Sequence, residues 1–407
     1  MYKCVACKNN IGLEPIIDLG VHGFADTFLS DKNAEEIVLP LIVGMCEHCF
    51  MIQNLARTKA TARYQDHEYS YTSSNSKFSR DYWDSVAALL NEKILKSKED
   101  RILEIGSNDG YLLEAIRSHG YLNISGIDAS IIMVELAKKR GIKTINAIFN
   151  EHFPRSHFNQ KFNLIIANNV FNHSDDPASF LRGVYDLLQE NGTFIYEVPY
   201  WGETITSGHF DQIYHEHVTY HTVTNAKKLL NTNGFDLMNI EFTPYHGQCL
   251  RVYAKKIDTS NVPSINVYTK IKEEEPLHSP MDQRVWANKV YENRLNGLKS
   301  FHLISDAVHK RKQIIFGIGA AAKANTFLSF YGLTHKEIDF ITDASPQKIG
   351  KVTPLTRIPI VDDSYLDTID LTNVDIYAIL LSWNLEFLKP KLLERYPNIK
   401  FLNFFGE

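Results

Sequence analysis

Short apolar runs alternate with amphipathic segments along most of the chain, and this pattern predicts an α/β protein. Between residues 101 and 255 the apolar runs have the length of buried strands, and the segments between them repeat apolar residues every three or four positions, as helices do. The predicted strands are Arg101–Gly106, Ile124–Asp128, Phe162–Asn168, Thr193–Val198, Asp236–Thr243 and Cys249–Lys255. The predicted helices are Phe78–Lys96, Tyr111–Ser118, Ile131–Arg140, Pro177–Gln189 and Thr224–Asn233. This alternation is typical of βαβ units on a parallel sheet.

A second set of alternating elements follows a polar segment, residues 256–280, which we expect to be a linker. A long amphipathic helix is predicted over Met281–Lys312. The elements predicted after it are Gln313–Gly317, Ala320–Tyr331, Ile338–Asp343, Asp375–Leu381, Leu385–Arg395 and Lys400–Phe405. The chain is therefore expected to contain a small N-terminal module (1–75) and two α/β domains (76–255 and 281–407).

Composition and charge narrow the classes of protein that fit. The chain has 407 residues, of which 44% are apolar and 22% charged, so a disordered or disulfide-stapled chain is excluded. Its 43 basic and 48 acidic residues give a net charge of −5, which disfavours a nucleic-acid partner. The longest apolar run, Val38–Met45, contains Pro40 and is too short to span a bilayer. No apolar secretory segment follows Met1, so we expect a soluble, cytoplasmic protein.

Four of the five cysteines form two Cys-x-x-Cys pairs, Cys4 with Cys7 and Cys46 with Cys49. Two thiolates on a tight turn can both bind one ion, and two such turns complete a tetrahedral zinc site. The alternatives are two redox pairs or buried free thiols. Four cysteine ligands leave no open coordination position, so the zinc is expected to be structural. Cys249 is expected to be a small core residue.

The turn after the first predicted strand of residues 101–255 carries the residues of a cofactor site. Gly106 permits close approach of a ligand, and Asp128, at the end of the next strand, can bind the hydroxyls of a ribose. Glu104 and Asp109 make the turn acidic, and Asn108 stands where a dinucleotide-binding turn has a glycine. Acidic groups repel a pyrophosphate and favour a ligand with an amino group and a sulfonium, so S-adenosylmethionine fits better than NAD. The alternative is a turn without a ligand.

Two further groups of polar residues follow later strands. Asn168 and Asn169 end one strand, where they either contact the cofactor or serve as ordinary turn residues. Residues 208–221 contain four histidines, two tyrosines and two carboxylates, including Tyr214, His215, Glu216 and His217. A histidine beside a carboxylate and a phenol can transfer protons, so catalysis is the preferred interpretation. A second metal site and a polar surface loop are the alternatives.

Several separated stretches of the sequence resemble one enzyme family. Besides the cysteine pairs they are Leu103–Leu113 (LEIGSNDGYLL), Gly208–Tyr220 (GHFDQIYHEHVTY), Gly317–Leu328 (GIGAAAKANTFL) and Thr342–Ile360 (TDASPQKIGKVTPLTRIPI). These stretches occur in the same order in the three-domain S-adenosylmethionine-dependent C-methyltransferases of deoxysugar biosynthesis. His246–Ala254 (HGQCLRVYA) is similar too, although Gln248-Cys249 replaces the more usual Gly-Ser. The resemblance implies a Rossmann-like class I methyltransferase domain, a second Rossmann-like domain, and methylation at C3 of a nucleotide-linked 4-keto-6-deoxy sugar through an enolate.

The resemblance also implies roles for individual residues. His217 is similar in position to the family's general base, and Tyr214 and Glu216 to residues that orient the base or the sugar. His173 matches a further active-site histidine that could donate to the C4 oxygen. Tyr71 resembles a tyrosine that the zinc-side segment contributes, and Tyr69 is the alternative match. His209 and His221 have no assigned role.

The turn that opens the second α/β domain is the candidate substrate site. Its small residues allow a ligand to approach closely, and Lys323 could pair with a phosphate at the start of the helix. Tight packing with a solvated Lys323 is the alternative. Because the first turn is assigned to the cofactor, we expect Lys323, Asn325 and Arg251 to bind the nucleotide diphosphate of the substrate.

Other functions remain open at this stage. The chain could be an O- or N-methyltransferase acting on another small metabolite, or a non-catalytic zinc-containing binding module. A nicotinamide enzyme is disfavoured by the Asn108-Asp109 turn. The sequence decides neither the nucleobase and stereoisomer of the substrate nor the oligomeric state.

Overall fold

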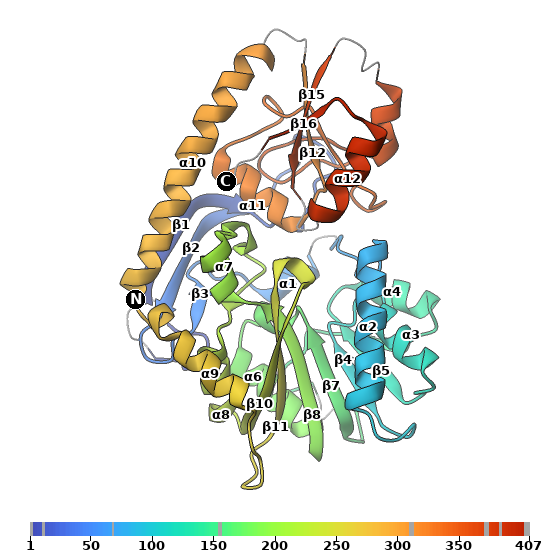
Figure 1. Cartoon of the computed structure of the whole chain (residues 1–407). Coiled ribbons are helices and arrows are strands. Elements are labelled where there is room, and N and C mark those ends of the chain that lie inside the picture. The colour runs from blue at the N-terminus through green and yellow to red at the C-terminus, as the bar shows by residue number, and fades with distance from the viewer. Residues whose placement is uncertain are drawn as a thin grey trace. The chain divides into compact units, whose positions relative to one another are not determined.

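The computed structural model describes residues 3–9, 13–66, 69–153, 157–308, 313–369, 374–381 and 385–402. The chain divides into two compact units, each built from segments that are distant in sequence (Figure 1). Unit 1 consists of Met1–Glu14, Gly44–Gly202 and His217–Pro280. Unit 2 consists of Pro15–Val43, Glu203–Glu216 and Met281–Glu407. None of the helices in the described part of the chain has the length and apolar composition that crossing a bilayer requires.

A seven-stranded sheet forms the centre of unit 1. Its strands lie in the order β10 (Phe235–Thr243), β11 (Cys249–Lys256), β8 (Leu188–Pro199), β7 (Phe162–Asn168), β4 (Ile102–Ile105), β5 (Ile124–Asp128) and β6 (Thr144–Asn146). Strand β11 is antiparallel to both of its neighbours, and the other strands are parallel to one another. Because β4 lies between β5 and β7, the strand order reverses at β4. In open α/β sheets such a reversal creates the crevice that binds ligands at the carboxyl ends of the strands.

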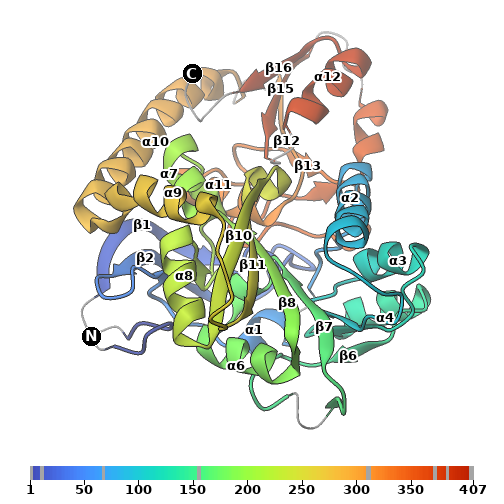
Figure 2. The same ribbon diagram turned by 60° about the horizontal axis from the view of Figure 1, so that its bottom comes forward.

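Helices cover both faces of this sheet. They are α1 (Ala60–Tyr64), α2 (Lys77–Lys93), α3 (Tyr111–Ser118), α4 (Ile131–Lys139), α6 (Pro177–Leu187), α8 (Val223–Thr232) and α9 (Ile265–Glu273). Figures 1 and 2 show α2, α3 and α4 on one face and α6 and α8 on the other. Right-handed crossovers produce this division, because the chain moves toward β6 on one side of β4 and toward β10 on the other. The predicted strands and helices of residues 78–255 are all present, with ends that shift by a few residues.

The segment 256–280, expected to be a linker, contains helix α9 instead. Val267 on this helix is fully buried. Glu274 at its end is also buried, and its carboxylate accepts hydrogen bonds from the backbone N–H groups of Val223 and Thr224, each at 2.8 Å. These two N–H groups open helix α8, so the carboxylate caps the positive end of that helix. A polar run with the composition of a linker thus belongs to the packed unit.

The cysteine pairs of unit 1 lie beside a short strand pair. Strand β2 (Val38–Cys46) ends at the first cysteine of the second pair, and β3 (Ile52–Asn54) follows that pair. Strand β3 pairs antiparallel with β9 (Thr219–Tyr220). The backbone N–H of Asn54 also donates to the carbonyl of Val218 at 3.1 Å. The segment that follows Cys46 and Cys49 is therefore joined by backbone hydrogen bonds to the segment that carries His217.

Unit 2 contains a fully parallel sheet of five strands. In order these are β14 (Ile360–Val361), β13 (Phe340–Thr342), β12 (Gln313–Ile318), β15 (Asp375–Leu380) and β16 (Ile399–Leu402). Its helices are α10 (Pro280–Val308), α11 (Ala322–Tyr331) and α12 (Leu385–Arg395), and part of α7 (Trp201–Ser207) also belongs to it. The sheet's core includes Phe316, Ile318, Phe340, Ile376 and Ala378. The ends predicted for the long helix (309–312) and for the last strand (403–405) lie outside the described residues.

Residues 15–43 join unit 2, although we expected them in an N-terminal module. They contain most of β1 (Leu13–Gly23) and the start of its neighbour β2. Leu29 and Val352 exchange two backbone hydrogen bonds, of 3.0 and 2.9 Å. The guanidinium of Arg357 also lies 2.7 Å from the carboxylate of Glu36. These residues belong to unit 2 because their contact partners lie more than 300 residues away in the sequence. Sequence periodicity reports only local structure, so it could not predict this grouping.

Candidate cofactor cavity and active site

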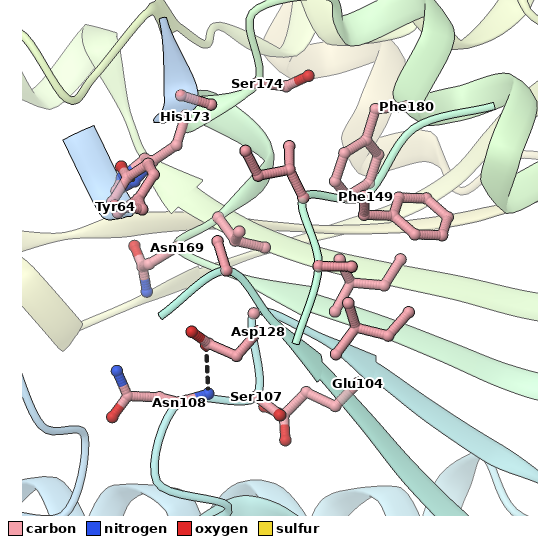
Figure 3. A pocket seen from close by; sticks show the side chains of 18 of the residues that line it. Tyr64, Glu104, Ser107, Asn108, Asp128, Phe149, Asn169, His173, Ser174 and Phe180 are labelled. Carbon is pink, nitrogen blue, oxygen red and sulfur yellow. Dashed lines mark hydrogen bonds between the residues drawn. The ribbon is translucent and has the colours of Figure 1, made fainter. Parts of the chain in front are cut away.

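A cavity of about 460 Å³ opens at the carboxyl ends of β4, β5 and β7, where the strand order reverses. It is lined by 30 residues of unit 1, among them Tyr64, Tyr69, Tyr71, Glu104, Gly106, Asn108, Asp128, Phe149, Asn168, Asn169, His173 and Phe180. Figure 3 shows the acidic side chains of Glu104 and Asp128 in this cavity, together with the aromatic rings of Phe149 and Phe180. Polar groups beside apolar walls are typical of a pocket for a small ligand that carries an aromatic base.

The turn after β4 is shaped by glycine. Gly106 has φ +72°, and a Cβ added there would lie 2.7 Å from the side chain of Val170. A side chain at this position would thus be strained by the backbone and by lack of space. Asn108 also has a positive φ of 51°, which asparagine tolerates better than most residues. This geometry explains why glycine and asparagine occupy these positions, while close approach of a ligand to the turn stays a prediction.

Asp128 ends β5 and is held by two backbone groups. Its carboxylate accepts a hydrogen bond of 2.8 Å from the N–H of Asn108 (Figure 3) and another of 2.8 Å from the N–H of Ser130. Burial raises the pKa of Asp128 to about 6, although these hydrogen bonds favour its ionised form. The carboxylate has a fixed orientation at the cavity wall and can still accept from hydroxyl groups of a ligand.

The two acidic residues beside this turn differ in position. Glu104 lines the cavity, its Oε2 has no hydrogen-bond partner among the described residues, and burial raises its pKa well above the usual value. Asp109, which we expected at the cofactor, does not line the cavity. Its carboxylate instead accepts from the hydroxyl of Ser73 at 2.6 Å and pairs with Arg140 at 3.0 Å. Asp109 therefore ties the segment before α2 to the sheet.

The two asparagines at the end of β7 both line the cavity. The N–H of Asn169 donates to the carbonyl of Glu197 at 2.6 Å, and its side-chain oxygen accepts from the thiol of Cys249 at 3.6 Å. Its side-chain nitrogen has no partner within the described structure. Asn169 can therefore donate a hydrogen bond to a ligand, whereas Cys249 is a buried residue of β11, as expected.

His173 lies at one edge of this cavity, on a short 3-10 helix (Phe171–His173). Its Nδ1 is hydrogen-bonded to the hydroxyl of Tyr64, and its buried Nε2 has no partner in the described part of the chain. Burial, reinforced by His217 and Arg63, lowers the pKa of His173 well below its usual value, so the ring is neutral near pH 7. The sequence analysis missed Tyr64, because α1 is too short to give a periodic signal.

Both tyrosines that the sequence analysis proposed line the cavity. The hydroxyl of Tyr71 lies 2.9 Å from that of Tyr245 and 3.5 Å from Nε2 of His246. The ring of Tyr69 packs at 5.3 Å against that of Tyr64. His246, another residue that we missed, has a positive φ of 51°. The unusual His-Gly-Gln-Cys sequence of residues 246–249 was the signal that could have identified it.

His217 is buried in unit 1 beside His173. The centroids of their two rings are 5.0 Å apart. The carbonyl of His217 accepts a hydrogen bond of 2.7 Å from the side chain of Asn54, which fixes the backbone at this point. The structure thus brings together His173 and His217, two of the proposed catalytic residues that are 44 positions apart in the sequence.

Residues 214–216 belong to unit 2. Glu216 accepts a hydrogen bond of 2.9 Å from the N–H of Asp26, and its Oε2 has no partner among the residues described. Burial, and then the nearby Asp26, raise the pKa of Glu216 to about 7. His215 is hydrogen-bonded through Nε2 to the carbonyl of Leu39 at 3.2 Å, which is a structural contact. Tyr214 is half-buried.

Arg251, which we expected to bind substrate, is buried in an ion pair. Its guanidinium lies 3.0 Å from the carboxylate of Glu197, which is fully buried, and 3.3 Å from that of Glu241. The hydroxyl of Tyr82 donates to Glu197 and accepts from Arg251 at 2.8 Å. The charge of Arg251 is thus already compensated inside unit 1.

The turn after β12 in unit 2 repeats the geometry found at Asp128. Asp343 accepts hydrogen bonds of 2.8 Å from the N–H of Ala320 and the N–H of Ser345. Gly319, with φ +86°, donates its N–H to the carbonyl of Thr342 at 2.8 Å, as Gly106 does to the carbonyl of Ile127 at 2.7 Å. The sequence analysis missed Asp343. The repeated tripeptide Asp-Ala-Ser, at 128–130 and 343–345, was the available signal.

Lys323 and Asn325 lie in the first turn of α11 and are both buried. The amide nitrogen of Asn325 donates to the carbonyl of Ala25 at 2.6 Å, and its oxygen has no partner in the described chain. Lys323 is near enough to Asp211 to help lower the pKa of that carboxyl. The alternative of a solvated Lys323 is therefore wrong, while nucleotide binding stays a prediction.

The four paired cysteines form one cluster, with all sulfur atoms within 4.8 Å of one another. Sulfur–sulfur distances of 3.6 Å (Cys4 to Cys49) and 3.7 Å (Cys7 to Cys46) match the edge of about 3.8 Å of a tetrahedron with Zn–S bonds of about 2.3 Å. The neighbouring Cys46 thiol raises the pKa of Cys4 to about 12, so four thiolates in this cluster need a cation. The residues therefore fit a structural zinc ion.

The two cysteine turns have the same backbone design. Each ends in a residue with positive φ, Lys8 (61°) after the first pair and Phe50 (62°) after the second. The N–H of each of these residues donates to the carbonyl of the first cysteine of its pair, at 3.1 and 2.8 Å. Paired turns of this kind present two sulfur atoms to one ion, which supports the zinc interpretation.

Comparison with known proteins gives two family matches that follow each other along the chain. Residues 75–240 match a methyltransferase domain, and residues 244–392 match a C-methyltransferase C-terminal domain. The C-methyltransferase NovU of Streptomyces niveus is 27% identical over 390 residues, which cover 94% of this chain and 90% of that protein.

Solved structures with similarity to part of the chain include methyltransferases. The magnesium protoporphyrin IX methyltransferase of Synechocystis with bound SAH is 16% identical, covers 44% of this chain and 83% of its own, and has a TM-score of 0.35. An S-adenosylmethionine-dependent methyltransferase of Clostridium acetobutylicum is also 16% identical, covers 44% of this chain and 92% of its own, and has a TM-score of 0.36. The two family matches, the relative and the cavity at the strand reversal together identify the protein as an S-adenosylmethionine-dependent C-methyltransferase.

Proposed function

We propose that the enzyme methylates C3 of a nucleotide-linked 4-keto-6-deoxy sugar through an enolate. The observation that carries the proposal is the pair of His173, which lines the cofactor cavity, and His217, which is buried beside it with its ring centroid 5.0 Å from that of His173. Methyl transfer to oxygen or nitrogen needs at most one base, whereas transfer to carbon next to a ketone needs a base and a group that stabilises the enolate oxygen. Two adjacent histidines with different roles meet this requirement.

The two histidines have different roles in this proposal, which follow from their different surroundings. His217 is the base that removes the C3 proton, and the electron pair of that C–H bond becomes the enolate. His173 lines the cavity, is kept neutral by desolvation and has no partner for its Nε2 among the described residues, so this nitrogen is the candidate donor to the C4 oxygen as negative charge develops there. Tyr71, which lines the same cavity, is placed to orient the sugar, and Tyr214 and Glu216 precede the base in the chain.

S-adenosylmethionine, when bound, supplies an electrophilic methyl group that the C3 carbon of the enolate attacks. Asp128 fits the ribose hydroxyls, because its carboxylate is oriented by two backbone N–H groups. Glu104 and Asn169 offer an acceptor and a donor for the polar groups of the methionine part. Asn168 and the turn residues Gly106 and Asn108 complete this side of the cavity.

The nucleotide part of the substrate is assigned to unit 2. Its support is the repeated Asp-Ala-Ser turn around Asp343, together with the buried Lys323 and Asn325 in the first turn of α11. A lysine at the start of a helix can bind a phosphate, and Asp343 can accept from a sugar hydroxyl. We no longer assign Arg251 to the substrate, because Glu197 and Glu241 already compensate its charge.

Proton exchange tests the proposal directly. A panel of nucleotide-linked 4-keto-6-deoxy sugars should be incubated with the enzyme and S-adenosylhomocysteine in deuterated water, and the C3 proton followed by NMR. Wild type should exchange the C3 proton of at least one compound, because enolate formation precedes methyl transfer. With S-adenosylmethionine, carbon NMR should show the new methyl group on C3.

The variant His217→Asn should lower turnover by about 10²–10⁴-fold and abolish this exchange, with affinity for S-adenosylhomocysteine unchanged. His335→Asn is the matched control, because His335 is exposed in unit 2 and should behave as wild type. Exchange at the wild-type rate in His217→Asn would move the role of base to another residue. Lack of exchange and of methylation with every sugar of the panel would refute the proposed substrate class.

A further inference from the structure

We propose that Tyr64 is a positioning residue that selects the tautomer of His173, holding its proton on Nε2, where it faces the substrate. The inference rests on the proposed function for the identity of the group that accepts this hydrogen bond. It concerns a residue of the short helix α1, which the sequence pattern did not single out.

The contact between the two side chains is direct and enclosed. The Tyr64 hydroxyl is hydrogen-bonded to Nδ1 of His173, and the two rings are stacked, with centroids 5.9 Å apart and planes inclined by 11°. Both residues line the cofactor cavity, where Figure 3 shows them next to each other. The phenol is therefore placed to act on the histidine through Nδ1, which leaves Nε2 as the nitrogen without a partner among the described residues.

Helix α1 is fastened to the loop that carries His173. The guanidinium of Arg63 donates to the carbonyl of His173 at 2.9 Å and pairs with the carboxylate of Asp175 at 2.5 Å. The other oxygen of Asp175 accepts from the N–H of Ala60 at 2.8 Å, at the start of the same helix. Arg63 is itself buried. These hydrogen bonds and this ion pair fasten helix α1 to the loop that carries His173, so they fix Tyr64 and His173 relative to each other.

The chemistry of the pair decides where the proton lies. A phenol hydroxyl is a stronger donor than a neutral imidazole N–H, and an imidazole nitrogen is a stronger acceptor than a phenol oxygen, so Tyr64 donates and Nδ1 accepts. A neutral imidazole that accepts at Nδ1 carries its proton on Nε2. This Nε2 is buried and without a partner among the described residues. A buried donor without a partner is unfavourable, and a developing oxyanion in the cavity would satisfy it.

Nitrogen NMR on the ligand-free enzyme is the primary test. Long-range 1H–15N correlation spectra of protein labelled with 15N-histidine distinguish the two tautomers, and His173→Gln identifies the signals of His173. Wild type should show His173 as the Nε2–H tautomer, and Tyr64→Phe should show a mixture of tautomers, because the aromatic ring remains but the donor is lost. Tyr69→Phe is the matched control, since Tyr69 lines the same cavity and packs against Tyr64. It should leave the His173 signals unchanged.

Kinetics then relate the tautomer to turnover. Tyr64→Phe should lower kcat by roughly 10–100-fold with KM and affinity for S-adenosylhomocysteine within about twofold of wild type, because the donor to the oxyanion is mispositioned in part of the molecules. Unchanged cofactor affinity in the variant shows that the cavity is folded. An Nδ1–H tautomer in wild type would overturn the inference, as would an unchanged spectrum in Tyr64→Phe.

Failure of the inference differs from failure of the proposed function. The NMR experiment uses no sugar, so the Nε2–H tautomer can be established even if no keto sugar is methylated, which would reject only the substrate class. Conversely, C3 exchange in wild type together with an Nδ1–H tautomer at His173 would leave the proposed function standing and reject the role of Tyr64.

Discussion

Replacing Asp128 by asparagine should weaken cofactor binding without unfolding the enzyme. The Asp128 carboxylate lies at the end of β5, accepts the N–H groups of Asn108 and Ser130 at 2.8 Å each, and lines the cavity. A carboxylate can accept more than these two hydrogen bonds, so Asp128 has capacity left for the two hydroxyls of a ribose. Asparagine keeps the size of the side chain but exchanges one acceptor oxygen for a donor and removes the charge.

The expected magnitude follows from the hydrogen bonds that are lost. A hydrogen bond to a charged group contributes about 1.5–3 kcal/mol, and asparagine can still accept one of the two hydroxyls. We expect a loss of about 2–3 kcal/mol, which corresponds to a dissociation constant roughly 30–150-fold higher at about 1.4 kcal/mol per factor of ten. The assay is isothermal titration calorimetry with S-adenosylhomocysteine, which measures binding without turnover.

The pH dependence of binding gives a second measure of the same group. Burial raises the pKa of Asp128 to about 6 in the ligand-free protein. Hydroxyl donors stabilise the ionised carboxylate, so the bound state has the lower pKa and binding releases a proton when the pH is below about 6. Affinity should therefore fall as the pH drops through 6, by up to about tenfold per pH unit, and this dependence should be absent in Asp128→Asn.

Asp343→Asn is the matched control for the cofactor experiment. Asp343 also accepts two backbone N–H groups, those of Ala320 and Ser345, at the same distances of 2.8 Å in a similar turn of unit 2. Its replacement should disturb that turn equally and leave affinity for S-adenosylhomocysteine unchanged. Equal affinities of wild type and Asp128→Asn would refute the assignment of the ribose to Asp128. A similar loss in Asp343→Asn would show that the effect is not specific to the turn at Asp128, and would also refute the assignment.

The remaining predictions concern the metal and the buried ion pair. Freshly purified protein should contain about one equivalent of zinc by elemental analysis. Cys7→Ser should lose the zinc and have a lower thermal stability. Less than half an equivalent of zinc in unchelated wild type would contradict a zinc site at this cluster. Arg251→Met should lower the free energy of unfolding by about 3–5 kcal/mol at pH 8, because Glu197 stays buried without its cation. The loss should be smaller at pH 5, since burial already raises the pKa of Glu197 and a carboxyl with a raised folded pKa loses stability as the pH increases. Urea unfolding at both pH values measures this, and unchanged stability with a raised KM would return Arg251 to the substrate site.

The local elements of the two sheets could be predicted from the sequence. Helix α3 and strands β5 and β7 have the predicted bounds, because buried parallel strands are short and apolar and helices repeat every three or four residues. The cofactor turn could also be predicted, since Gly106 and Asp128 lie on elements that are adjacent both in the chain and in the sheet. The cysteine pairs were predictable for a similar reason, because each pair forms a single turn and the ligand chemistry requires four sulfur atoms.

Other features depended on contacts between distant segments, which no local pattern reports. Asp109 and Arg251 have the residue types of binding groups, yet both are engaged inside the protein. Asp109 is hydrogen-bonded to Ser73 and paired with Arg140, and Arg251 is paired with Glu197. Helix α9 forms in a polar segment because its end caps α8.

The candidate active site shows the same division between sequence and tertiary structure. The sequence by itself determined which residue types are candidates for the chemistry, namely the histidines, the cysteine pairs and the acidic turn. Only the tertiary structure decided that His173 lies beside His217. It also decided that Tyr64 is hydrogen-bonded to His173, which is 109 positions away in the chain. The physical reason is that the position of a side chain in a site is set by packing and hydrogen bonds across the whole unit, whereas periodicity and spacing register only neighbours along the chain.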